Sequence, residues 1–145
     1  MRGVIAVNRS RLRLVGPLIE VLGLAIWVEL ALRRRPFDRV LSEVADPGMR
    51  VGAESEICHA TFDRAIRAAY RILPLEPTCL KHVLIVCRVR RRRGLPAHIR
   101  IGVRKDEGVF AAHAWLEDEA GRPLTDPSND FAPLVSVRHG GGRNL

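Results

Sequence analysis

The spacing of apolar residues changes near residues 94–96, and this change constrains the possible folds more than any other feature of the chain. Before it, apolar residues recur every three or four positions, which is typical of amphipathic helices. After it, Ile99, Ile101 and Val103 alternate with polar residues, which is typical of a half-buried strand. Because helices come first and strands last, the sequence predicts an α+β fold, with N-terminal helices followed by an antiparallel sheet.

Helices are predicted throughout the first two thirds of the chain. An almost uniformly apolar segment covers residues 14–32, a shorter segment with helical spacing starts at Phe37, and a third covers residues 57–73. A fourth helix is expected to begin at Cys79, because a proline-rich break precedes it and Thr78 can act as its N-cap.

Strands are predicted over residues 98–104, 109–117 and 123–126, with short turns between them. A chain of 145 residues can bury one hydrophobic core, so a single domain over residues 1–145 is expected. Within it we distinguish a helical N-terminal part (1–56), a core that contains the predicted strands and any catalytic residues (57–135), and a flexible tail (136–145).

The apolar segment 14–32 is nearly long enough to span a membrane and is flanked by arginines. However, Glu20 and Glu29 are nine positions apart, which places them about 180° apart around a helix. Two carboxylates on opposite sides of a lone span would both be costly in lipid. We therefore expect a largely buried helix of the domain or a helix that faces a protein partner.

The chain is strongly basic, with 24 Lys and Arg against 16 Asp and Glu and a formal charge of +8. This balance favours acidic partners, which include acidic peptides, nucleic acids and anionic membrane surfaces. The arginine runs 33–35 and 90–93 favour nucleic acid among these, whereas the aromatic content of 5% and the lack of helix-turn-helix or zinc-finger spacing disfavour it. We expect both runs to close helices and to sit in solvent, with no nucleic-acid partner.

The three cysteines, at positions 58, 79 and 87, indicate a reducing compartment. Cys79 and Cys87 would be separated by about 12 Å along one helix, which is too far for a disulfide. The N-terminal apolar run is too short for a secretory signal, so a cytoplasmic location is expected. Although Cys58-His59 and the pair Cys79 and His82 are zinc-ligand types, no pair repeats with finger-like spacing, and no metal site is expected.

Cys79 at a helix N-terminus is a candidate nucleophile, because the helix dipole lowers the pKa of a thiol there. His113 lies 34 residues later in the middle of a predicted strand, and Asp126 lies 13 residues after that, at the end of the next one. This order allows a base to hold the thiolate and a carboxylate to orient the base. The spacing alone leaves open an inert thiol, a packed histidine and an ordinary turn carboxylate.

A family resemblance covers residues 74–134. It is carried by Cys-Leu after a proline, an Arg-rich helix end that runs into Gly-Leu-Pro, RIGV, AHAWLE, and Gly-X-Pro-Leu-X-Asp. This region resembles the catalytic part of lasso-peptide leader peptidases, which have a transglutaminase-like, papain-related cysteine protease core. The resemblance implies that Cys79 is the nucleophile, that His113 is the base and acid, and that Asp126 orients His113.

The resemblance also implies a substrate and partners. The bacterial enzymes of this family cut the leader from a ribosomally made precursor peptide, and a separate asparagine-synthetase-like cyclase then closes the ring. Some members begin with a PqqD-like leader-recognition domain, for which this chain has no room, so a separate leader-binding protein is expected. No Gly-rich phosphate loop is present, so no cofactor is expected. A transglutaminase-like acyltransferase, a non-catalytic scaffold of the same fold and a basic nucleic-acid-binding module stay open as alternatives.

Overall fold

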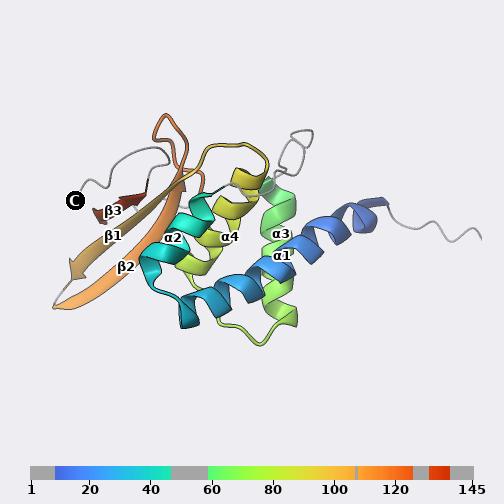
Figure 1. The fold of residues 1–145 in the computed structure, drawn as a ribbon, viewed down its shortest axis with the longest axis horizontal. Coiled ribbons are helices and arrows are strands. Elements are labelled where there is room, and N and C mark those ends of the chain that lie inside the picture. Colours follow the sequence, from blue (N-terminus) through green and yellow to red (C-terminus); the bar gives the residue numbers. More distant parts are fainter. Residues whose placement is uncertain (1–8, 47–58, 107, 126–130, 138–145) are drawn as a thin grey trace, which may run out of the picture.

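The computed structural model describes residues 9–46, 59–106, 108–125 and 131–137, in which four helices precede three strands (Figure 1). The predicted α+β fold with N-terminal helices and a C-terminal antiparallel sheet is confirmed. The elements are, in order, α1 (Arg9–Arg34), α2 (Phe37–Ala45), α3 (His59–Ile72), α4 (Cys79–Arg92), β1 (His98–Asp106), β2 (Val109–Glu117) and β3 (Ala132–Val137).

The sheet has the strand order β2-β1-β3, and both pairings are antiparallel. The hairpin between β1 and β2 turns at Gly108, whose φ of 88° lies in the left-handed region that glycine favours. In the pairing of β1 with β3 the register shifts between Ile101 and Gly102, which is the pattern of a β-bulge.

The prediction of a third strand over residues 123–126 is wrong, and the third strand is β3. Pro123 forms an isolated bridge with Glu117, and the Leu124 N–H donates to the Leu116 carbonyl at 2.7 Å. The ladder ends there because the N–H of Leu116 donates to the side-chain Oγ1 of Thr125 at 2.8 Å, not to a backbone carbonyl. β3 also runs two residues into the predicted tail, whose residues 138–145 lie outside the described ranges.

Helix α4 is the centre of the hydrophobic core and contacts β1, β2, α1 and α2. Figure 1 shows the sheet on one side of the helices, with α3 on the far side and α1 crossing the bundle. α4 is buried on most of its circumference because its middle residues are almost all aliphatic; the buried ones are Val83, Leu84, Ile85, Val86, Cys87 and Val89. Opposite them in the sheet, Ile99, Ala114 and Leu116 are buried in the same cluster.

Helix α1 packs antiparallel to α4 through ion pairs at both ends. Glu20 accepts two hydrogen bonds from the Arg93 guanidinium, at 2.7 and 3.1 Å, and Glu29 lies 2.8 Å from the Lys81 ammonium. Both carboxylates of the apolar segment are thus neutralised within the protein. By length and composition, residues 14–34 of α1 would suffice to cross a membrane, and part of this helix is buried in the core.

The expectation that residues 90–93 sit in solvent is wrong. Arg90 is 7% exposed and donates to the Pro96 carbonyl, and Arg91 donates to the Ala97 carbonyl. Arg93 lies over the Phe62 ring at 4.8 Å and pairs with Glu20. The run binds carbonyls and side chains within the fold because the chain folds back against the end of α4, where cations also suit the helix dipole. At the end of α1, Arg33 is exposed as expected.

Candidate active site

Cys79 is the first residue of α4, and it is exposed. The predicted N-cap is confirmed, since Thr78 has extended dihedral angles and its Oγ1 accepts a hydrogen bond from the Lys81 N–H at 3.3 Å. The Lys81 ammonium in turn donates to the Glu76 carbonyl at 2.9 Å and pairs with Glu29 of α1. The first turn of α4 is therefore held to the preceding loop and to α1, which fixes the place of the thiol.

Cys87, two turns further along α4, is a different kind of thiol. It is 1% exposed, and burial raises its pKa to about 11, although nearby arginines act in the opposite direction. A thiol with such a pKa is almost wholly protonated at neutral pH and is a poor nucleophile. The structure thus gives Cys87 a packing role.

His113 lies in the middle of β2, between two aromatic rings. Its ring stacks on Trp115 at 6.2 Å between centroids and meets Phe131 at 5.4 Å. The Trp115 Nε1–H donates to Glu117 at 2.9 Å, and Arg100 donates to the same carboxylate at 2.8 Å. Burial opposes ionisation of Glu117, but the hydrogen bonds from Arg100 and Trp115 outweigh it and lower the pKa of this carboxyl. An ionised Glu117 therefore holds the ring against which His113 stacks.

Gly102 is the residue of β1 that pairs with His113. A Cβ at this position would lie 2.9 Å from both the Ala132 carbonyl oxygen and the Phe131 Cβ, and 3.0 Å from the Trp115 ring. The bulge begins at the same residue, and bulges often occur where a strand must redirect a side chain beside an active site. The missing side chain of Gly102 thus allows Phe131 and Trp115 to approach the sheet on either side of His113.

The elements that carry the first two predicted triad residues contact each other, since α4 packs against β2. Successive side chains of a strand point to opposite faces. Ala114 and Leu116 are buried in the core, so His113 and Trp115 lie on the other face of the sheet. Because β2 is an edge strand of the described sheet, the Cys79 thiol would have to meet His113 around that edge. This contact stays a prediction.

Asp126, the third predicted triad residue, lies outside the described residues. Its chain neighbour Thr125 bonds to the backbone of Leu116, three residues along β2 from His113. At about 3.3 Å per residue this is a separation of about 10 Å along the strand. The role of Asp126 also stays a prediction.

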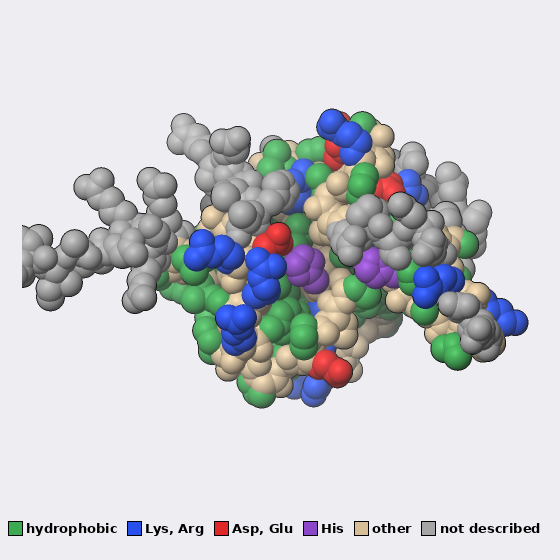
Figure 2. Space-filling view, turned by 180° about the vertical axis from the view of Figure 1, so that it is seen from behind, with side chains coloured by type: hydrophobic (Ala, Val, Ile, Leu, Met, Phe, Trp, Pro, Cys, Tyr) green, Lys and Arg blue, Asp and Glu red, His purple; other side chains and the backbone are tan. Residues whose placement is uncertain are grey.

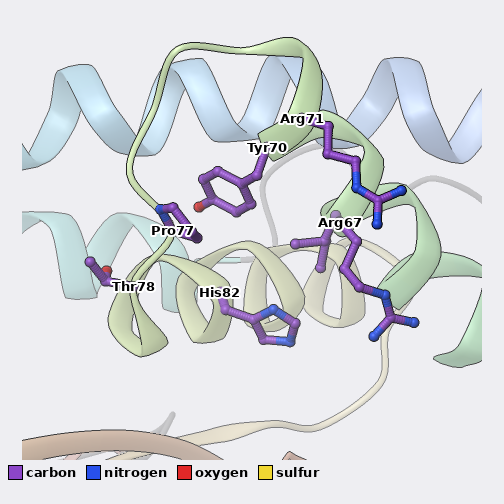
Figure 3. Close-up of a pocket in the computed structure, with 7 residues that line it drawn as sticks. Arg67, Tyr70, Arg71, Pro77, Thr78 and His82 are labelled. Carbon is purple, nitrogen blue, oxygen red and sulfur yellow. The ribbon is translucent and has the colours of Figure 1, made fainter.

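A pocket of about 320 Å³ opens beside the first turn of α4 (Figure 3). It lies between α4 and the second half of α3, and two of its lining residues, Thr78 and His82, flank Cys79 in the chain. The complete lining is Ile66, Arg67, Tyr70, Arg71, Pro77, Thr78 and His82. Burial lowers the pKa of His82, against the opposing effect of Asp63, whose carboxylate lies 3.7 Å from its Nε2. His82 is therefore mainly neutral at pH 7.

Comparison with known proteins settles the family. The model of the transglutaminase-like superfamily matches residues 21–136, from within α1 to the last residues of β3. The chain belongs to the transglutaminase-like superfamily. This superfamily includes cysteine peptidases and acyltransferases. Searches among curated proteins and among solved structures find no match to the chain.

Several residues that shape this transglutaminase-like site were not predicted as functional. Gly102 interrupts a strand of alternating β-branched residues, which is a recognisable sign of close backbone approach. Trp115 and Glu117 stand two and four positions from His113 and share its face of the strand, so the alternation of the strand could have grouped them with it. Phe131 carries no such signal, because its role depends on contacts with a distant segment.

Proposed function

We propose that this protein is a cytoplasmic cysteine peptidase that removes the leader from a ribosomally made lasso-type precursor peptide. The observation that carries the proposal is the exposed Cys79 at the capped first turn of α4, in a chain of the transglutaminase-like superfamily. The motifs around Cys79 and His113 support the finer assignment to leader peptidases.

In the proposed reaction the Cys79 thiolate attacks the scissile carbonyl carbon, and the carbonyl π electrons move onto its oxygen. The C–N bond then breaks while His113 gives its proton to the departing amine. Water, deprotonated by His113, hydrolyses the thioester and releases the leader as a carboxylic acid. Asp126 orients His113 and stabilises its protonated form.

The first turn of α4 can also stabilise the negative oxygen of the intermediate. The N–H groups of the first helical residues have no carbonyl acceptor within the helix. The N–H of Lys81 donates instead to the side-chain hydroxyl of Thr78. The N–H groups of Cys79 and Leu80 are thus placed at the positive end of the helix dipole, beside the sulfur.

The proposed partners are the precursor peptide, a PqqD-like leader-recognition protein and an asparagine-synthetase-like cyclase. An apolar stripe of α1 is exposed and offers the leader-recognition protein a docking surface; we define the α1 stripe as Val15, Ile19, Ile26 and Leu30. The net charge of +8 favours encounter with an acidic partner, in a manner that salt screens.

Substitution of the proposed triad tests this function. Cys79→Ala and His113→Ala should each lower kcat for leader removal at least about a thousandfold, with the unfolding transition unchanged, while Asp126→Ala should be impaired less. Mass spectrometry of the released leader should find a free acid, whereas an acyltransferase would yield an amide. Cys58→Ala is the matched control for loss of a thiol. Cleavage by Cys79→Ala at a near wild-type rate would refute the mechanism.

A further inference from the structure

The pocket between α3 and α4 borders the proposed nucleophile. Residues three positions apart on a helix are neighbours, so His82 in the pocket wall lies beside Cys79 on the first turn of α4. Thr78, on the other side of Cys79 in the chain, lines the same pocket. A peptide held with its scissile carbonyl at Cys79 therefore passes close to the pocket mouth.

Two arginines of α3 face this pocket. Figure 3 shows the guanidinium groups of Arg67 and Arg71 extending to the same side of it. They are four positions apart, and like charges at this spacing destabilise a helix. Neither forms an ion pair with a carboxylate of the described residues, in contrast with Arg93 and Arg33, which pair with Glu20 and Glu29.

No carboxylate is among the described residues that line the pocket. Asp63 is directed toward His82, and the mainly neutral His82 adds little charge of its own. Figure 2 shows Lys and Arg side chains gathered beside a histidine and an acidic side chain on the face seen from behind. The two guanidinium groups in the lining can therefore attract an anion that enters the pocket.

The inner wall of the pocket is apolar. Ile66 is almost fully buried beneath it, Pro77 forms the opposite wall, and the Tyr70 ring turns toward Pro77 (Figure 3). Methylene groups can pack on such a surface while a terminal carboxylate reaches the guanidinium groups, which bind carboxylates in bidentate geometry. A glutamate side chain has this combination of an apolar stem and an anionic end.

We propose that this pocket is a specificity subsite for a glutamate side chain of the peptide substrate, bound by Arg67 and Arg71. The inference rests on the proposed peptidase function, because it takes the ligand to be the peptide cut at Cys79. At about 3.3 Å per residue, an extended peptide places this glutamate within about three residues of the scissile bond.

Binding to inactive protein tests the subsite independently of catalysis. The probes are three fluorescein-labelled decapeptides of Ala and Ser, which carry a glutamate, a glutamine or a lysine at the central position. The affinity of each for the Cys79→Ala protein is measured at low salt. The glutamate peptide should bind about fivefold more tightly than the glutamine peptide, as expected for one partly exposed charge pair. Arg67→Gln/Arg71→Gln in the same background should abolish this preference, and Arg67→Glu/Arg71→Glu should favour the lysine peptide.

Arg64→Gln is the matched control, because it removes an exposed arginine of α3 that does not line the pocket. Equal affinity of the Cys79→Ala protein for the glutamate and glutamine peptides would overturn the subsite. It would also be overturned if Arg64→Gln lost the glutamate preference as completely as Arg67→Gln/Arg71→Gln does. Cleavage assays with active protein report separately on the peptidase function. A glutamate preference without any cleavage would support the subsite and count against the proposed reaction.

Discussion

Gly102 shows how one residue can decide whether the environment of His113 forms. It pairs with His113 in the sheet, and backbone and side-chain atoms lie about 3 Å from where a Cβ would stand. Phe131 is among these atoms and also packs on the His113 ring. Adding a methyl group would therefore move the segment that covers His113, while the pairing of β1 with β2 stays intact.

We expect Gly102→Ala to lower the free energy of unfolding by about 1–3 kcal/mol, because it overpacks a closed site. It should also lower kcat for leader removal more than it raises KM, because the ring of the proposed base is displaced. Denaturant unfolding and steady-state kinetics measure the two effects. Gly23→Ala is the control, since nothing lies within 4 Å of that position in α1, and it should be neutral or stabilising. Unchanged kinetics in Gly102→Ala would show that Phe131 does not position His113.

At the scale of elements, the start of α4 depends on α1. Lys81 and Glu29 are both mostly buried and lie 2.8 Å apart, so their pair joins the turn that carries Cys79 to the longest helix. The hydrogen bond from Lys81 is the largest cause of the lowered pKa of Glu29. Because the folded pKa is below the ordinary value of 4.5, the pair stabilises the fold fully above about pH 4.5 and loses this effect as the pH falls further.

Lys81→Met should reduce the free energy of unfolding at pH 7 by about 1–3 kcal/mol, because it leaves a mostly buried carboxylate without its main partner. The difference in free energy of unfolding between this variant and the wild type should become smaller below pH 4.5, where Glu29 becomes protonated. Thermal unfolding across pH 3 to 7 measures this dependence. Arg39→Met is the control, because Arg39 pairs with Glu43 on the surface and should contribute less than about 0.5 kcal/mol. If the loss in free energy of unfolding caused by Lys81→Met does not change with pH, the loss comes from packing and not from the ion pair.

The sequence predicts elements well where their signals are local. Thr78 followed by Cys79 marks the start of α4 because an N-cap uses only its own first turn. β3 was missed because Pro133 weakens its strand pattern, although proline is tolerated there on an edge strand. The pocket could not be predicted, since it depends on how far apart tertiary packing holds α3 and α4. The contacts of the arginine run 90–93 could not be predicted for the same reason.

At the scale of the whole molecule, part of the positive charge belongs to arginines that bind other groups within the fold. Arg90, Arg91 and Arg93 bind carbonyl groups or a carboxylate within the fold, so the run that most resembled a nucleic-acid contact is largely used internally. The α1 stripe is apolar and exposed, with Ile19 at 65% and Ile26 at 45%. These two residues are seven positions apart and thus lie on the same side of the helix.

The Ile19→Glu/Ile26→Glu variant tests whether the α1 stripe is the docking surface for the leader-recognition protein. Both side chains are exposed, so the fold should persist, whereas two buried carboxylates would weaken the interface by at least about tenfold. Leader removal in the presence of that protein should fall accordingly, and the slow reaction without it should stay unchanged. Val109→Glu is the control, because Val109 lies on the β1–β2 hairpin and is at least as exposed as Ile19 and Ile26.

The same variant separates a protein partner from a membrane surface. A membrane role predicts that wild-type protein sediments with anionic vesicles and that the variant does not, with cleavage in solution unaffected. A docking role predicts that the wild-type protein does not sediment with vesicles and that the variant cleaves poorly in the presence of the leader-recognition protein. The reason is that burial of the α1 stripe then stabilises only the complex with that partner. Equal loss of cleavage with and without the leader-recognition protein would contradict docking, since it would show that the stripe supports the active fold itself.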